Sequence, residues 1–421
     1  MDERVFVEPE QLAIGMFVIL DLSWLQHPFS FSSFLIQSDD QLATLRGLGL
    51  DRIRIDPARG KGPVLPVEAE PPQVPPVPTP ETAPEGMTRT DQELRSERDR
   101  VLRSSIANAE KEAAAAARSA RQATRQFRSE PGKAIEQIGT LIAGIAESLL
   151  GNSATMVHLL GDKGIGDEVY YHSLNVAVLA LILGKAMGLD AGALQTIGVA
   201  AIFHDVGMAD LAPRVRLKNE ALTVAEEALL RQHCEAGAKL ALRSGLPQEV
   251  ALAILQHHEH LDGSGYPNRL AGEKIGPVAR VIAIVNHYDH LCNPAQAAAV
   301  VTPYEALSTM FARKRNWFDG AMLAKLVHVL GVYPPGSIVQ LSSGETAMVI
   351  SVNAARPLRP MLLVYDPQIP KAEALILDLE ELPQISISKA LRAVNLPPPV
   401  HEYLSPRKRV AYFFGDEARA D

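Results

Sequence analysis

The chain has 421 residues and a mass of 45.6 kDa, too long for one ordinary core, so we expect two or three folded units. Its formal net charge of −8 and pI near 5.9 argue against bulk nucleic-acid binding, which requires a basic face. Its two cysteines exclude a disulfide framework, and the charged N-terminus predicts no signal peptide. The most apolar run, Leu174–Leu183, is shorter than the roughly 20 residues of a membrane span, so we expect a cytoplasmic protein.

Residues 1–56 are predicted to form a small α+β domain with a regulatory or assembly role. Strands are expected at 5–7, 17–20, 35–36 and 53–55, with a short helix at 42–45. Residues 57–88 are predicted to be an extended linker, because ten of the thirty prolines lie there and proline has no N–H to donate. A ligand for a proline-binding partner is the alternative interpretation of this linker.

Residues 89–160 are predicted to be a helical connector. The stretch 91–128 is rich in Ala, Glu and Arg and contains neither proline nor glycine, which is the composition of a helix. From Ile135 to Leu149, apolar residues recur at spacings of three and four, which indicates a packed helical face. We expect this second helix to dock on the domain that follows, or on its copy in a homodimer.

Residues 161–332 are predicted to form an all-α domain and residues 333–380 a small β appendage. The helices are expected at 168–188, 191–205, 223–244, 247–260, 275–292, 303–312 and 318–330. The strands are expected at 338–341, 347–350 and 360–365. The tail, 381–421, is expected to hold one short helix. The predicted fold class is therefore mainly α, with a small C-terminal β appendage and a separate N-terminal α+β domain.

Nine of the twelve histidines fall within 158–290, on the predicted all-α domain. Glu168 and His172 are four residues apart on one helix and so share a face. His204-Asp205 ends an apolar helix, and His257-His258 repeats the arrangement. Because the side chains of adjacent helical residues diverge by about 100°, such a pair can reach two neighbouring sites. Imidazoles and carboxylates bind Fe, Mn, Zn, Ni or Co. So many ligands suit two or three ions, a recurring device for phosphoester hydrolysis.

Other residues in the same region have simpler interpretations. A single histidine is more often a hydrogen-bonded core or surface residue than a ligand, and we assign that role to His158, His260, His287 and His290. Cys234, beside His233, is interpreted as a buried thiol, with a soft metal ligand as the alternative. The glycine-rich run at 263–265 directly follows the double histidine and is expected to form a loop closing over the site.

These motifs resemble the HD-GYP family of cyclic di-GMP phosphodiesterases over about residues 160–350. The resemblance rests on His172-Ser173-Leu174-Asn175-Val176-Ala177, His204-Asp205-Val206-Gly207, His233, His257-His258-Glu259 and Asp262-Gly263-Ser264-Gly265-Tyr266-Pro267. It implies that the all-α domain has the HD-type fold and is catalytic. The run Leu12–Val18 is similar to a domain often found before HD-GYP domains.

The resemblance implies a metal-dependent phosphodiesterase that hydrolyses cyclic di-GMP to pGpG, and in some members on to GMP, through a metal-activated hydroxide. It implies two or three divalent ions, Fe or Mn ahead of Zn, Ni or Co. Carried over, the metal ligands fall on His172, His204, Asp205, His233, His257 and His258, with Glu168 as the extra carboxylate of trinuclear members and Asn286 at the place of a closing aspartate. His204 and Asp205 are assigned as catalytic. Contacts to substrate are assigned to Lys218, Gly263, Gly265 and Tyr266.

Three departures from the family pattern concern charge. Met208 stands where the family has lysine, Asn286 replaces the aspartate, and the basic residues expected after residue 292 are absent. Lys218 and Arg214 are candidates to supply the missing positive charge, with surface ion pairs as their simpler role. Two alternatives therefore stay open: a weakly active effector that binds cyclic di-GMP or a protein, and a phosphohydrolase for another nucleotide. In some family members the Gly-Tyr-Pro motif contacts diguanylate cyclase domains, which makes those domains a possible partner.

Overall fold

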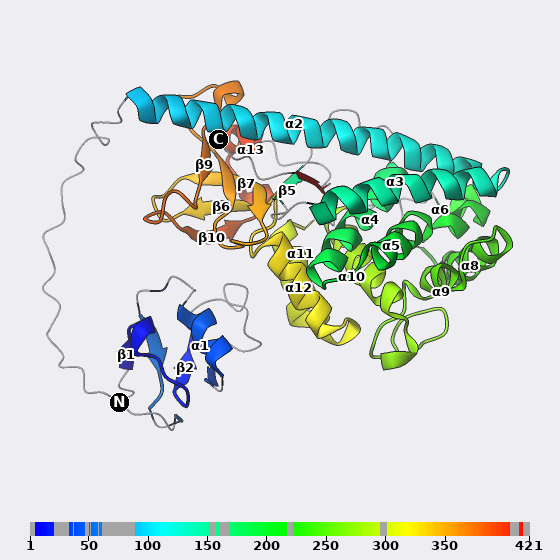
Figure 1. Ribbon diagram of the computed structural model, residues 1–421, viewed down its shortest axis with the longest axis horizontal. Coiled ribbons are helices and arrows are strands. Elements are labelled where there is room, and N and C mark those ends of the chain that lie inside the picture. Colours follow the sequence, from blue (N-terminus) through cyan, green and yellow to red (C-terminus); the bar gives the residue numbers. More distant parts are fainter. Residues whose placement is uncertain are drawn as a thin grey trace, which may run out of the picture. The chain divides into compact units, whose positions relative to one another are not determined.

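A computed structural model of the chain describes residues 5–20, 33–36, 38–46, 50, 52–57, 59–60, 89–151, 156–159, 168–216, 222–294, 301–404 and 412–415. The chain divides into two compact units, Met1–Arg95 and Ser96–Asp421. The predicted linker at 57–88 lies mostly outside the described residues. The fold is mainly α with a strand-rich N-terminal unit and strands at the C-terminal end, as the sequence predicts (Figure 1).

The first unit is built on a four-stranded antiparallel sheet in the order β1-β4-β2-β3. Its elements are β1 (Val5–Val7), η1 (Pro9–Gln11), β2 (Phe17–Ile19), β3 (Ser33–Leu35), α1 (Asp39–Arg46) and β4 (Ile53–Ile55). The core is aliphatic, with Val18, Ile36 and Leu45 fully buried. The predicted strands are confirmed, although the third begins earlier and the helix is longer than expected.

Two long helices open the second part of the chain, α2 (Arg89–Gln126) and α3 (Pro131–Gly151). Within the second unit, α2 runs along both the helices and the strands (Figure 1): Arg103 donates to the Ala374 carbonyl at 2.9 Å. The α3 helix packs on α5, where a Cβ added to Gly198 would lie 2.4 Å from the Ile142 side chain. This confirms the first of the two docking sites predicted for α3, its own helical domain.

Among the described residues, α3 is also the one helix long and apolar enough to cross a membrane. Its apolar residues Ile138, Ile142 and Leu149 are fully buried in the core of the second unit. Lys133 and Glu136 lie on its exposed side. Since a core helix meets the same criteria of length and composition, the packing accounts for its apolar character.

The helical core holds the elements that position the site. They are α4 (Glu168–Ala186), α5 (Ala191–Phe203), η2 (Val206–Asp210), α6 (Pro213–Arg216), α7 (Val224–Arg231), α8 (His233–Arg243), α9 (Gln248–Gln256), η3 (Gly272–Lys274), α10 (Pro277–Cys292), α11 (Pro303–Arg313), η5 (Arg315–Trp317) and α12 (Gly320–Leu330). The α4 helix packs on α5, α10 and α12, and α8 packs on α9. The segment 223–244, expected as one helix, is two, because α7 ends at Arg231 and α8 begins at His233.

The C-terminal part forms a seven-stranded antiparallel sheet that is larger than the predicted appendage. Its strands are β5 (Met156–Leu159), β6 (Ile338–Leu341), β7 (Thr346–Asn353), β8 (Met361–Val364), β9 (Ile376–Asp378), β10 (Ile387–Leu391) and β11 (Tyr412–Gly415), with η6 (Lys371–Glu373), η7 (Ala393–Asn395) and α13 (Pro398–Leu404) between them. The order is β10-β6-β7-β5-β11, with β8 beside β7 and β9 beside β8. The expectation of a tail with only one short helix was wrong, because that tail contributes two strands.

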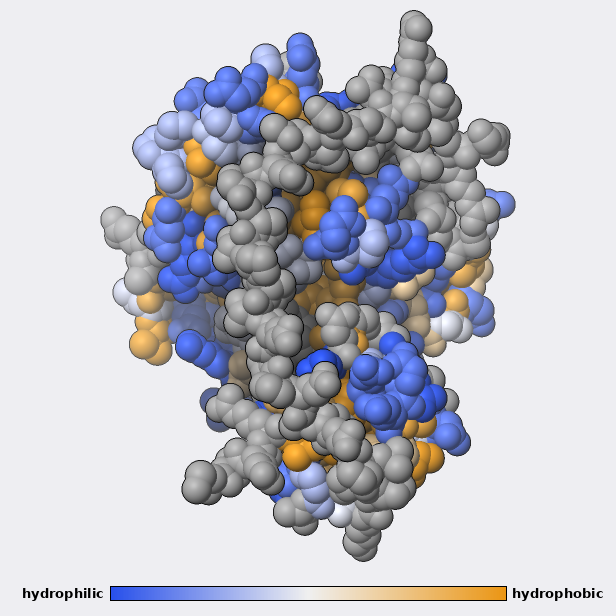
Figure 2. Space-filling view, turned by 90° about the vertical axis from the view of Figure 1, so that its left-hand side faces the viewer, coloured by the Kyte–Doolittle hydropathy of each residue, from blue (hydrophilic) through white to orange (hydrophobic). Residues whose placement is uncertain are grey.

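On the face shown in Figure 2, hydrophilic residues predominate and apolar residues lie between them in separate patches. Large side chains that are well exposed include Val224, Leu242 and Val394. Single exposed apolar residues are ordinary on a folded surface and by themselves indicate no binding site.

Candidate metal centre

The histidines and the aspartate of the predicted site lie near the ends of four helices. His172 lies in the second turn of α4, and His204 caps the C-terminus of α5. His233 is the first residue of α8, and His257 caps the C-terminus of α9. Because each helix ends or begins at the site, its ligand candidate projects into the space between the helices instead of being covered by a further turn.

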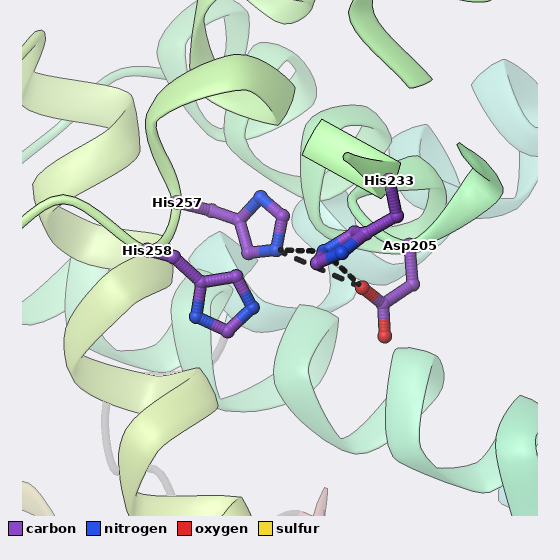
Figure 3. A group of neighbouring side chains, drawn as sticks. All are labelled: Asp205, His233, His257 and His258. Carbon is purple, nitrogen blue, oxygen red and sulfur yellow. Dashed lines mark hydrogen bonds and ion pairs between the residues drawn. The ribbon is translucent and has the colours of Figure 1, made fainter. Parts of the chain in front are cut away.

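Asp205 lies between two groups of imidazoles and presents one carboxylate oxygen to each. Its Oδ1 is 3.3 Å from His233 Nε2 and 3.7 Å from His257 Nε2 (Figure 3). Its Oδ2 is 3.4 Å from His204 Nε2 and 3.9 Å from His172 Nε2. The two groups, Asp205 with His233, His257 and His258, and Asp205 with His172 and His204, each have donor atoms within 4.8 Å of one another. One carboxylate is therefore shared by two candidate metal sites.

In four of the histidine rings, the Nδ1 atom hydrogen-bonds to an oxygen acceptor, which fixes the ring. The Nδ1 atoms of His204, His233 and His257 each lie 2.7 Å from the backbone carbonyl three residues earlier, and His172 Nδ1 lies 2.6 Å from Asp289 Oδ2. A ring that donates its Nδ1 proton carries a lone pair at Nε2 when it is neutral. These hydrogen bonds therefore select the tautomer that a metal ligand needs and orient each ring.

The lone pairs face one another across short distances, which is why the site suits cations. The Nε2 atoms of His172 and His204 are 3.2 Å apart, and those of His233 and His257 are 3.3 Å apart. Two neutral rings with both lone pairs turned inward repel each other unless a cation or an added proton lies between them. The side-chain oxygen of Asn286 is buried and accepts no hydrogen bond from the described residues, so it too offers a free donor atom. These residues fit a pair of divalent ions.

Burial and the interactions between Asp205 and the histidines shift the pKa values of the groups at the centre. Burial alone would raise the pKa of the Asp205 carboxyl, but the surrounding imidazoles hold it well below its usual value. Burial lowers the pKa of His257 to about 4 and that of His258 well below its usual range. Burial would also lower the pKa of His233, but its hydrogen bond to Asp205 raises it to about 11. Because a metal ligand must be a neutral ring, His233 would have to give up a proton to hold an ion, whereas burial already favours the neutral form of His257 and His258.

Two glycines let the backbone carrying these histidines come close together. A Cβ at Gly207 would lie 2.1 Å from the His233 carbonyl oxygen and 2.5 Å from Gly237 N, so η2 could not rest against α8 with any larger residue. A Cβ at Gly265 would lie 2.4 Å from His260 N, in the loop after the double histidine. Both contacts are to backbone atoms, which cannot move aside as a flexible side chain would.

The loop over 259–272 forms one wall beside the centre. Buried Glu259 accepts hydrogen bonds from the backbone N–H groups of Asn268 at 2.7 Å and Leu270 at 2.9 Å, which holds the loop closed on itself. The Tyr266 ring stacks on His258 with centroids 4.5 Å apart, and the Arg231 guanidinium lies over its other face. This places the Gly-Tyr-Pro segment next to a ligand candidate, as the expected loop requires.

Comparison with known proteins identifies the family. The HD domain family matches residues 144–322, and a domain of unknown function (DUF3391) matches residues 5–138. The cyclic di-GMP phosphodiesterase PA4108 of Pseudomonas aeruginosa is 30% identical over 362 residues, which cover 84% of this chain and 83% of that protein. The chain belongs to the HD-GYP family. The HD-GYP assignment made from the sequence motifs is thereby confirmed.

Other relatives of this HD-GYP protein share smaller parts of the chain. The 3′3′-cGAMP-specific phosphodiesterase 2 of Vibrio cholerae is 31% identical over 165 residues, which cover 39% of this chain and 31% of that protein. Among solved structures, Bd1817, a HDG"Y"P protein from Bdellovibrio bacteriovorus, aligns over 78% of this chain and 99% of its own with a TM-score of 0.44 and 15% identity.

The structure brings together six of the residues that the sequence of this HD-GYP protein singles out, and Asn286 lies beside them on α10, facing His172. Two other predicted residues cannot be placed: α4 begins at Glu168, but its side chain lies outside the described residues, as does Lys218. The pair His257-His258, expected to be able to reach two neighbouring sites, lies in one group, directly after α9 ends at Gln256.

Two residues next to the centre were missed by sequence reasoning. Asp289 is fully buried and holds His172, and the signal for it was its position one turn after Asn286 on the same helix. His290, given the role of a hydrogen-bonded core or surface residue, bonds to the Asn286 carbonyl at 2.9 Å and packs edge-on against His172 with ring centroids 4.7 Å apart. All four histidines given ordinary roles lie outside both groups. Cys234 is a buried free thiol, as predicted.

Proposed function

We propose that this HD-GYP protein hydrolyses cyclic di-GMP at a site holding two divalent ions. The observation that carries the proposal is the Asp205 carboxylate, whose two oxygens face two separate imidazole groups. A binding module without catalysis has no need of a carboxylate shared between two ligand groups. Relatives named as cyclic di-GMP phosphodiesterases support the choice of substrate.

In this proposal His233, His257 and His258 hold one ion, and His172 and His204 hold the other, with Asp205 shared and Asn286 completing the set. Glu168 is the proposed ligand of a third ion. Imidazole and carboxylate donors suit Fe or Mn, and also Zn, Ni or Co. When bound, such a pair of ions activates the attacking water and stabilises negative charge on the phosphoryl oxygens.

The residues of the chain itself orient and expose the centre. His204, His233 and His257 are fully buried, whereas His172, Asp205 and His258 are half-buried, so the substrate approaches from the side of these last three. On that side lies the loop with Tyr266, the proposed substrate contact; Gly265 lets this loop pack closely, and Gly263 takes a positive φ of 78°. Met208 is half-buried and brings no charge, so the ions themselves must carry most of the attraction for phosphate.

The product is proposed to be pGpG, with GMP as a second step. Two alternative functions each have one observation in their favour. Because Met208 and Asn286 lower the positive and negative charge expected at the site, the protein could bind cyclic di-GMP without turning it over. The relatives named as specific for 3′3′-cGAMP favour a different cyclic dinucleotide as substrate.

The remaining proposals concern location and partners. Two buried free cysteines are compatible with a reducing cytoplasm, where we propose that the protein acts. The Gly-Tyr-Pro segment is the proposed contact for diguanylate cyclase domains, and the connector helices are the proposed homodimer contact. Size-exclusion chromatography with light scattering, with and without a cyclase domain, tests both.

The function is tested by incubating the full chain, loaded with Mn²⁺ or Fe²⁺, with cyclic di-GMP, 3′3′-cGAMP and pGpG in separate reactions and following the products by chromatography. We expect cyclic di-GMP to be consumed fastest, and chelator-treated protein to be inactive until metal is restored. Binding of cyclic di-GMP with no product under any metal would establish the effector instead. Faster loss of 3′3′-cGAMP would assign the other substrate.

A further inference from the structure

A buried chain of hydrogen bonds connects His172 to the C-terminal strand. His172 Nδ1 is 2.6 Å from Asp289 Oδ2, and the other oxygen of Asp289 accepts from the Asn175 side-chain NH₂. The side-chain oxygen of Asn175 in turn accepts from the backbone N–H of Tyr412 at 2.8 Å. The links run from α4 to α10, back to α4, and then to β11. The last residue of the path therefore lies at the far end of the sequence from the first.

The middle of this path is closed to water. Asn175 is 4% exposed, Asp289 1% and Tyr412 2%. Asn293 also donates to Asp289 Oδ1, at 2.8 Å, so this carboxylate has a partner on every side. A buried carboxylate that loses one of these donors cannot replace it with solvent, so each link constrains the next.

The β11 strand is an edge strand of the sheet, bound on one side to β5 and on the other to the helical core. Tyr412 pairs with Leu159 of β5, while its N–H donates to Asn175 and not to another strand. Its hydroxyl lies 2.7 Å from the Tyr288 hydroxyl on α10, next to Asp289. The strand thus contacts the helix that carries Asp289 at one point and its partner Asn175 at another.

We propose that β11 positions His172, through Asn175 and Asp289, and thereby sets the metal affinity of the group formed by His172, His204 and Asp205. Asn175 and Asp289 are positioning residues in this scheme, because neither belongs to the two ligand groups. The inference rests on the proposed function only in that His172 is a metal ligand. The other group, with His233 and His257, has its rings fixed by local backbone carbonyls and does not depend on the strand.

Two consequences distinguish positioning from general stabilisation. First, loss of Asn175 should weaken one metal ion and not the other, by the 10- to 100-fold typical of outer-sphere partners of metal-bound histidines. Second, coupling between two sites is reciprocal, so metal at His172 must also stabilise β11. Hydrogen exchange of the Tyr412 amide reports that second effect directly, because this N–H is a link in the path.

The test uses the full chain and Co²⁺ as the probe, with two binding constants from calorimetry and visible absorption. The variants are Asn175→Leu, which removes the two hydrogen bonds of the path at similar volume, Asp289→Asn, and the double variant. Val176→Ala is the matched control, since it is the next residue of α4 and equally buried but outside the path. Thermal unfolding of metal-free protein measures the general stability of each.

We expect one of the two Co²⁺ constants to fall about 10- to 100-fold in both single variants and no further in the double variant, because both break one path. Val176→Ala should lose stability but keep both constants. In wild-type protein, Co²⁺ should slow exchange of the Tyr412 amide. A folded Asn175→Leu protein with both constants unchanged overturns the inference. So does unchanged Tyr412 exchange in wild-type protein, a measurement that needs no variant. Neither measurement uses a substrate, so both outcomes are independent of whether the protein hydrolyses cyclic di-GMP.

Discussion

Replacing Asp205 by asparagine is the most informative single change, because it keeps the shape of the side chain and removes its charge. In the wild-type protein, the carboxylate oxygens lie 3.3 Å from His233 Nε2 and 3.4 Å from His204 Nε2, so an ion held by either group would lie next to a full negative charge. An amide offers one neutral oxygen in place of two anionic ones. Asp205→Asn therefore leaves both groups without an anionic ligand among the described residues.

The size of the effect follows from Coulomb's law. Unit charges 4 Å apart interact by about 4 kcal/mol at an effective dielectric constant of 20, which is a lower bound for a divalent ion. That energy corresponds to roughly a thousandfold in binding, since about 1.4 kcal/mol is tenfold. We expect Asp205→Asn to weaken the tighter ion by about this factor, to lose the second at micromolar metal, and to abolish hydrolysis of cyclic di-GMP.

The assay is metal content after gel filtration together with turnover of cyclic di-GMP. Asp210→Asn is the matched control, because Asp210 lies on the adjoining η2 helix but pairs with Arg128 at the surface. It should keep metal and activity. Circular dichroism establishes that both variants are folded. Asp205→Asn protein with two bound ions and wild-type turnover would refute the reasoning, since the shared carboxylate would then be dispensable.

Four further changes have defined outcomes. Asn286→Asp should tighten metal binding on the order of tenfold, since an anion replaces a neutral donor, and should raise the Michaelis constant for cyclic di-GMP. Calorimetry measures the metal affinity, and steady-state kinetics measure the Michaelis constant. Gly207→Ala should lower the free energy of unfolding by about 1–3 kcal/mol in urea and reduce the bound metal, because its Cβ would lie 2.1 Å from the His233 carbonyl. If Glu168 holds a third ion, Glu168→Gln should lower the metal count by one in elemental analysis and leave the two-ion site intact, and an unchanged count would make it an ordinary carboxylate. His158→Leu should make the protein less sensitive to acid. Burial lowers the pKa of His158 to about 4, so between pH 7.5 and 5 this histidine takes up a proton in the unfolded chain and not in the folded one. In urea unfolding, the stability of the wild-type protein should therefore fall by about 2 kcal/mol more than that of the variant over this pH range.

The helices and the ligand set could be predicted from the sequence because their signals are local. Apolar stretches separated by Gly, Pro and Asn give the positions of α4, α5 and α10, and the His204-Asp205 and His257-His258 pairs mark helix ends. The break at Gln232 was missed, because residues 223–244 have uniform helical composition. That break matters to the site, since it makes His233 the first residue of α8.

The support around the site could not be predicted, because it depends on pairings between distant residues. The β5 and β11 strands are short, and their pairing, Leu159 with Tyr412, joins residues from either side of the helical domain. Neither strand has enough alternation to indicate a partner. The contact between Asp289 and His172 likewise requires α10 to lie against α4, which only the packed core decides.

The most direct test of the central claim is the turnover of cyclic di-GMP while Mn²⁺ is added stepwise to metal-free protein at a concentration well above both binding constants. If two ions share Asp205 and act together, turnover stays near zero through the first equivalent and rises to its maximum by the time both sites are filled. Full turnover at one equivalent, or in the absence of metal, would contradict the account.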